Sequence, residues 1–228
     1  MDPSPLRAKI LETIVRKSSL KQQVFDNTFA TFNELKDILF EMSSEWDDEL
    51  DGRIDRRVRI EYRDRGKFEA QLQVANDILI FQMHTDVFEF GSDHLIWQNP
   101  YVQADRDNSY CGLINIYNFL SDSFKFNRNA DEGYLIGRIF INRERRYFAE
   151  GKQQNSMRAM DFGKSEIGQE ALVAILESAI GFALNFDLLM PPYEENKRVT
   201  VDQFNTKMDN SKFVTGKRLG YDFDVEDI

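Results

Sequence analysis

The sequence predicts an α+β fold, with an antiparallel sheet of about six or seven strands, two N-terminal helices and a long C-terminal helix packed on it. Apolar and polar residues alternate through much of residues 53–74, as in strands with one buried face. The expected strands are mostly joined by short turns, which favours antiparallel pairing because parallel strands need long crossovers. Helical periodicity flanks the strands on both sides, and segregated helices and strands are typical of the α+β class.

Two helices are expected before the strands. The first begins at Ser4-Pro5, because serine can cap a helix and proline is tolerated at its first position. Ser18-Ser19 is its expected weak point. A second helix is predicted from Thr31, because Thr31 and Glu34 have the spacing of a capping box. We therefore expect residues 1–52 to form an N-terminal helical segment that packs on the sheet.

The strands are expected to begin with a hairpin. Residues 54–62 and 68–74 both alternate, and Asp64-Arg65-Gly66 between them is typical of a turn. The apolar run 78–81 fits a strand that is covered on both faces. Residues 113–117 fit a strand, although 114–121 also fit a short helix. Further strands are expected within residues 83–90, at 94–97 and 134–141, and in a return through 146–148.

Residues 165–189 are predicted to form the longest helix, with Ser165 as its cap and Pro191-Pro192 as its stop. Its apolar residues extend nearly all round, so we expect cover on more than one side, by the sheet and by other helices or another subunit. Homo-oligomerisation through this helix is therefore predicted. We assign the sheet and this helix to one domain, residues 53–193, and residues 194–228 to a polar C-terminal tail.

Composition excludes several classes of function. The net charge of −10 argues against nucleic-acid binding, which uses a basic surface, and against attraction to anionic membranes. The apolar stretch 171–190 is interrupted by Glu177, Asn185 and Asp187, which are costly at bilayer depth. A single cysteine cannot form an internal disulfide, and the first ten residues contain no apolar signal core. We expect a cytoplasmic protein without a cofactor.

His84, Asp86, Asp93 and His94 form the densest set of candidate metal ligands. Neutral imidazole and carboxylate groups together suit zinc, iron or manganese, and such a site would make the protein a metal-dependent hydrolase. A turn rich in aspartate and two histidines on a polar sheet face explain the same residues without a metal. The sequence contains no HExxH or comparable signature that would decide between the two interpretations.

Cys111 is the candidate nucleophile, with His84 or His94 as its base. Apolar neighbours on both sides also fit a small buried residue without chemistry. Neither GxxxxGK[ST] nor GxGxxG occurs, so the sequence contains no recognised phosphate-binding loop.

Arginines dominate two stretches of this acidic chain. Residues 53–67 carry a net charge of +4, and a second group lies within 138–146. If the two hairpins are neighbours, their arginines would form a patch for phosphate or carboxylate groups. The alternative is a solvated sheet face on which they pair with Glu61, Glu69 and Glu144. The predicted ligand-binding residues are Arg57, Arg59, Arg63, Arg138 and Arg143.

The sequence thus predicts a binding or regulatory module for a protein or a small anionic ligand, not evidently catalytic. The metal-dependent hydrolase is the alternative. No nucleic acid and no membrane is expected as a partner.

Overall fold

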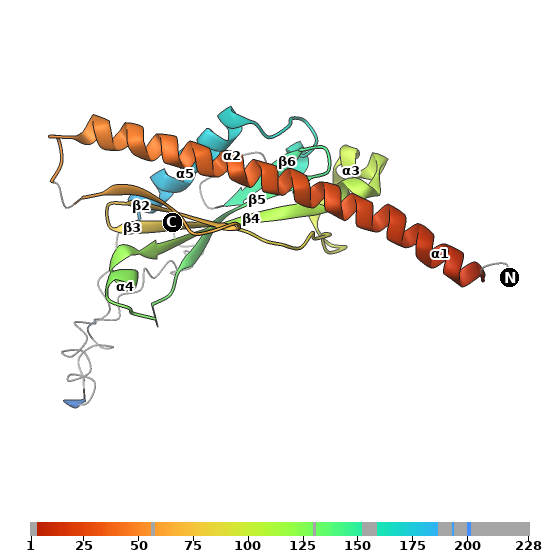
Figure 1. Ribbon diagram of the computed structural model, residues 1–228, viewed down its shortest axis with the longest axis horizontal. Helices are drawn as coiled ribbons and strands as arrows, with labels where there is room; N and C mark the ends of the chain where they lie inside the picture. Colours follow the sequence, from red (N-terminus) through yellow and green to blue (C-terminus); the bar gives the residue numbers. More distant parts are fainter. Residues whose placement is uncertain are drawn as a thin grey trace.

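A computed structural model describes residues 4–55, 58–129, 131–151, 159–186, 193, 200 and 201. One antiparallel sheet of six strands has the order β1-β2-β3-β4-β5-β6, so that every strand pairs with its neighbours in sequence. Two helices, α2 and α5, lie on one face of this sheet (Figure 1). The predicted α+β class and antiparallel sheet are therefore confirmed. The strands are β1 (Ile60–Asp64), β2 (Glu69–Val74), β3 (Asp77–Met83), β4 (Cys111–Leu120), β5 (Tyr134–Asn142) and β6 (Tyr147–Gly151).

The two predicted N-terminal helices are one continuous helix. It consists of α1 (Pro5–Thr13), a π-helical stretch (Ile14–Ser18) and α2 (Ser19–Leu50). The Ser4 hydroxyl caps its start by accepting from the Arg7 backbone N–H at 3.2 Å, as predicted. Thr31 caps nothing. It is buried within α2, and its hydroxyl donates to the Asn27 carbonyl at 2.9 Å. The capping-box spacing was misleading because the helix already continues through Thr31.

The first hairpin lies further along the chain than the alternation predicts. β1 starts at Ile60 rather than Ile54, and its register pairs Tyr62 with Leu72. The strand expected within residues 83–90 is reduced to an isolated bridge between Phe88 and Cys111. Residues predicted as a strand at 94–97 form a 3₁₀ turn instead, because the His94 ring nitrogen accepts the Ile96 N–H and caps the turn.

The second half of the sheet agrees better with the sequence. The ambiguous stretch after Gly112 belongs to β4, and β5 and β6 form the predicted hairpin. Short helical turns fill the connections: Leu95–Gln98, α3 (Pro100–Ala104), Arg106–Ser109, α4 (Ser121–Lys125) and Ala159–Asp161. Several of them cover the face of β4–β6 opposite to α2, where Cys111, Phe140 and Phe148 form a smaller apolar cluster.

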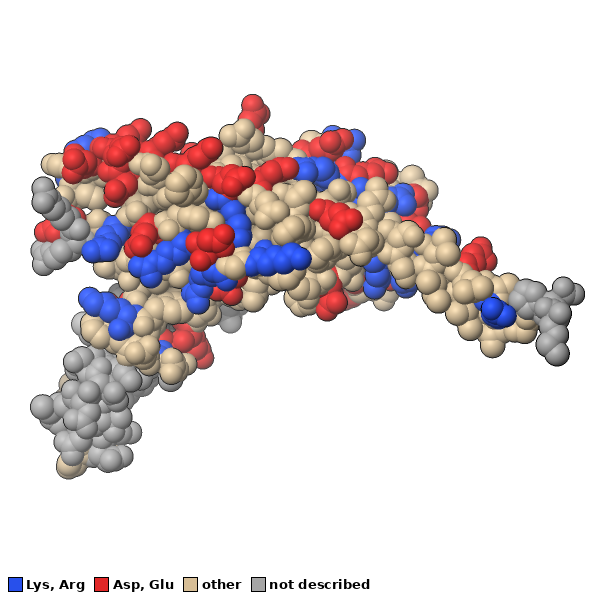
Figure 2. Space-filling model, viewed as in Figure 1, with Lys and Arg blue, Asp and Glu red and all other residues tan. Residues whose placement is uncertain are grey.

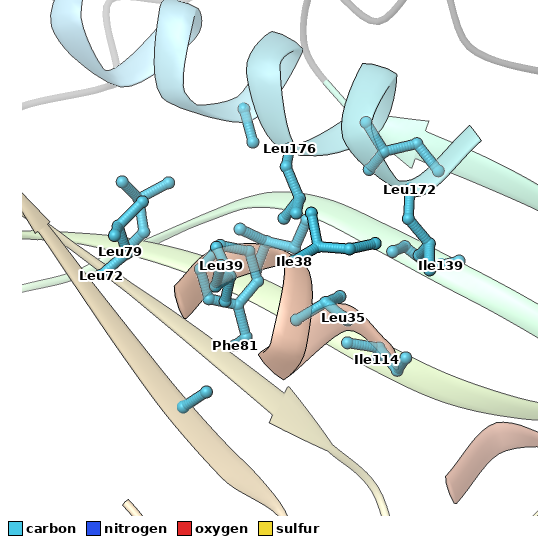
Figure 3. Close-up of a cluster of buried hydrophobic side chains, with 14 of the residues drawn as sticks. Leu35, Ile38, Leu39, Leu72, Leu79, Phe81, Ile114, Ile139, Leu172 and Leu176 are labelled. Atoms are coloured by element: carbon cyan, nitrogen blue, oxygen red, sulfur yellow. The ribbon is translucent and has the colours of Figure 1, made fainter. Parts of the chain in front are cut away.

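The main core lies between the sheet and the two helices (Figure 3). Leu35, Ile38 and Leu39 of α2 point into it, beside Leu172 and Leu176 of α5. The sheet contributes the apolar side of its alternation, including Leu72, Leu79, Phe81, Ile114 and Ile139. Each Å² of apolar surface that is removed from water stabilises the fold by about 25 cal/mol, so these contacts hold the helices on the sheet.

The C-terminal helix is shorter than predicted. α5 (Gln169–Leu184) has 16 residues against 32 in α2, and its N-cap is Gly168 rather than Ser165. Residues 187–189 of the predicted helix lie outside the described residues, as do 194–199 and 202–228 of the predicted tail. The division into residues 1–52, 53–193 and 194–228 stays a prediction. Within the described ranges, no helix combines the length and the hydropathy that crossing a membrane requires.

Candidate functional site

The predicted arginines do not come together. Arg59 and Arg63 lie at β1, whereas Arg138 belongs to β5 and Arg143 to the turn after it. The strand order puts β2, β3 and β4 between them. Neighbouring strands are about 4.8 Å apart, so β1 and β5 are separated by roughly 19 Å. Arg57 lies outside the described residues.

Three of these arginines have carboxylate partners. Arg63 donates two hydrogen bonds to Glu61, each 3.0 Å, and Arg138 donates to Glu150 at 2.6 Å. Arg143 donates to Asp105 at 2.6 Å. The Asp107 backbone N–H and then Arg143 lower the pKa of the Asp105 carboxyl, because both stabilise its charge. Such half-exposed pairs contribute little to stability. Anion binding by these arginines stays a prediction.

Each of the two histidines accepts a hydrogen bond within its own turn. The His84 Nδ1 accepts the Asp86 backbone N–H at 3.0 Å, and the His94 Nδ1 accepts that of Ile96 at 3.2 Å. Their rings pack on different phenylalanines, His84 on Phe88 and His94 on Phe90. Across the part of the chain that the structure describes, no three His, Cys, Asp or Glu side chains are grouped to hold a metal ion. The described structure therefore does not group His84, Asp86, Asp93 and His94 as one set of ligands, and the metal-dependent hydrolase stays a prediction.

Cys111 is inaccessible. Its side chain is fully buried in the apolar cluster under the α3 region, and burial raises the pKa of its thiol. The reactive thiolate is therefore suppressed at neutral pH. The structure favours the interpretation of Cys111 as a small buried residue rather than a nucleophile.

A groove of about 560 Å³ lies between the C-terminal end of α2 and the start of β1. We call it the acidic groove. Its apolar lining residues are Leu50, Ile54, Val58 and Ile60, and its charged ones are Asp47, Asp48, Asp51, Asp55, Glu61 and Arg59. These lining residues carry a net charge of −4, and the negative end of the α2 macrodipole adds to it. Figure 2 shows acidic side chains gathered over this end of α2.

Sequence reasoning missed the acidic groove. The helical segment predicted for residues 1–52 includes the acidic run 47–51, and the alternation of residues 54–62 predicts a strand. Ile54 and Val58 are instead more than one-third exposed beside that helix end. The available signal was the combination of the two, since apolar residues next to an acidic run are not explained by a sheet core.

The opposite end of the long helix lies largely uncovered by the rest of the described chain. We call residues 4–18 the projecting segment, because α1 extends beyond the sheet in Figure 1 and all of these residues are exposed. Near its base, Arg16 donates to Asp107 at 3.2 Å and Lys17 lies over the Tyr110 ring. Its large apolar side chains are 49–68% exposed: Leu6, Ile10, Leu11, Ile14 and Val15. In contrast to the whole chain, the projecting segment is basic, with a net charge of +3.

No protein-family model, curated protein or solved structure matches this chain.

Proposed function

We propose that this protein is a protein-binding module and that the projecting segment is its contact element. One observation carries the proposal: five large apolar side chains are exposed on a helix that the rest of the described chain leaves uncovered. Contiguous apolar surface in contact with water is unfavourable, and on folded proteins it marks interaction sites. Covering it would gain about 25 cal/mol per Å² of apolar surface.

The arrangement of the side chains supports docking of a helix into a groove. Leu6 and Ile10 are four residues apart, as are Leu11 and Val15, so the two members of each pair are neighbours on the helix surface. Lys9 and other polar residues occupy the opposite side. Apolar anchors spaced by three or four residues are the pattern by which helices bind grooves.

The segment is also helical before it binds. A helix of nine residues is marginal on its own, but α1 continues through the π-helical stretch into α2, which is fixed on the sheet. Little conformational entropy is therefore lost on binding. The basic charge of the segment favours a partner surface that is apolar with an acidic rim.

We further propose that binding takes place in the cytoplasm, in agreement with a lone, buried and reduced cysteine. Self-association through residues 165–189 stays a prediction. The structure gives it little support, because Leu184 is the only large apolar side chain of α5 that is more than one-third exposed. Binding of a small anionic ligand also stays a prediction.

A photo-activated cross-linking residue at Leu11 tests the proposal in the cells that produce the protein. We expect a discrete protein adduct, which includes the case of a second copy. The matched control places the same residue at Lys9, two positions away on the polar side of the helix, where the yield should be much lower. No adduct from position 11, or equal yields from both positions, would contradict the proposed function.

A further inference from the structure

We infer that the partner surface of the projecting segment is the acidic groove of a second copy of this chain. The inference rests on the proposed function and names the partner. The segment presents apolar side chains with basic charge, and the groove presents apolar side chains together with acidic ones. The two surfaces are therefore complementary in charge, and both carry apolar side chains that association would bury.

The two surfaces cannot meet within one molecule. They lie at opposite ends of the continuous helix from Pro5 to Leu50, which spans about 70 Å at 1.5 Å per residue (Figure 1). The helix is held straight across the sheet, so its N-terminal end does not fold back to its own C-terminal end. Contact between the segment and the groove has to be intermolecular.

Electrostatics specifies the orientation. The N-terminal end of a helix is the positive end of its dipole and the C-terminal end is the negative one. Antiparallel pairing of two long helices puts Arg7 and the positive end of one copy beside the groove and the negative end of the other. A two-fold axis forms this contact twice and closes the assembly as a dimer.

The apolar parts are also matched. Leu50, Ile54 and Val58 are among the apolar residues that line the groove. On the segment, Arg7 is four residues from Leu11 and therefore lies on the apolar side of the helix. The contact consequently pairs the basic and apolar side chains of the segment with the acidic and apolar side chains of the groove.

Membrane binding by the basic helix is the competing explanation. The chain as a whole carries a net charge of −10, which repels anionic lipid, whereas the segment carries only +3. Charge complementarity within the chain itself favours the second copy.

Complementary charge reversal tests the inference in the full chain. We expect the unmodified protein to sediment as two copies at micromolar concentration, and Arg7→Glu or Asp48→Lys to weaken this association by about tenfold or more. Mixing the two variants should restore it, because each contact then pairs opposite charges again. Lys9→Glu, on the polar side of the segment, and Glu41→Lys, on α2 outside the groove, make the same charge changes and should have much smaller effects.

Loss of folding is not expected to account for weaker association of these two variants. Arg7→Glu puts an acid in the first helical turn with the capping-box spacing from Ser4, and Asp48→Lys puts a base in the last turn. Both changes favour the helix.

A single-chain mass at all concentrations would overturn the inference, as would association that neither reversal weakens or that mixing does not restore. A monomeric chain that still cross-links another protein through position 11 would overturn self-docking and leave the proposed function intact. Binding of the monomeric chain to vesicles of anionic lipid would overturn self-docking in favour of a membrane surface.

Discussion

The projecting segment and α5 both carry large apolar side chains on a helix, but those of α5 are mostly buried and those of the projecting segment are exposed. In α5, six residues are buried: Leu172, Ile175, Leu176, Ala179, Ile180 and Ala183. In α1 and the π-helical stretch, none is buried. By composition alone α5 is the more apolar of the two, and it was the one predicted to self-associate. The exposed surface lies instead on the less apolar helix.

The reason for the difference is position relative to the sheet. α5 lies over the strands and against α2, so its apolar side chains are used inside the molecule. α2 lies on the same face of the sheet, but the continuous helix is longer than the sheet that it crosses (Figure 1). The part of the helix that extends beyond the sheet is the projecting segment. Apolar character therefore identifies a contact surface only after the internal contacts have been assigned.

The largest effect is expected from Ile180→Asp in α5. Ile180 is 2% exposed within the main core, and an unpaired carboxylate there should cost about 4 kcal/mol or more of the free energy of unfolding. Chemical denaturation followed by circular dichroism measures this loss, and Ile180→Val, at about 1 kcal/mol, is the control. A folded Ile180→Asp variant of normal stability would mean that α5 is exposed, and the contrast between a buried α5 and an exposed projecting segment would be wrong.

An intermediate effect is expected where α2 touches β4. A β-carbon on Gly112 would lie 2.8 Å from that of Thr28 and would overlap its hydroxyl and methyl groups. Gly112→Ala should therefore cost about 1–3 kcal/mol of unfolding free energy, because this close approach fixes where α2 lies on the sheet. Thr28→Ala in the same chain should recover part of the loss, since it removes two of the three overlapping atoms. Purely additive losses would show that the two residues do not touch.

The smallest effect on stability is expected from Ile10→Asp in the projecting segment. Ile10 is 49% exposed, so the same substitution that unfolds α5 should change the free energy of unfolding by less than about 1 kcal/mol here. The rate at which a thiol reagent modifies the buried Cys111 gives an independent measure of unfolding. A loss comparable to that of Ile180→Asp would place the segment inside a core and remove the basis for its role in binding.

Parts of the candidate surfaces were accessible from sequence and parts were not. The sequence predicts a helix over the residues of the projecting segment, with Ser4 as its cap, and the structure confirms both. Nothing local separates Ile10 from Ile38, because both have helical spacing. Only the sheet beneath one of them makes it a core residue. Arg59 and Arg138 were grouped by charge, and the strand order then placed three strands between β1 and β5.

By itself, the sequence determined the α+β class, the antiparallel sheet, and the β2, β3, β5 and β6 strands, because side-chain alternation, apolar runs and short turns are local properties of the chain. Tertiary structure alone decided that the N-terminal helix is continuous, where it leaves the body, and that Ile54 and Val58 line an acidic groove. These features depend on the extent of the sheet and on which faces meet across it, and such distances are set by packing between residues far apart in sequence.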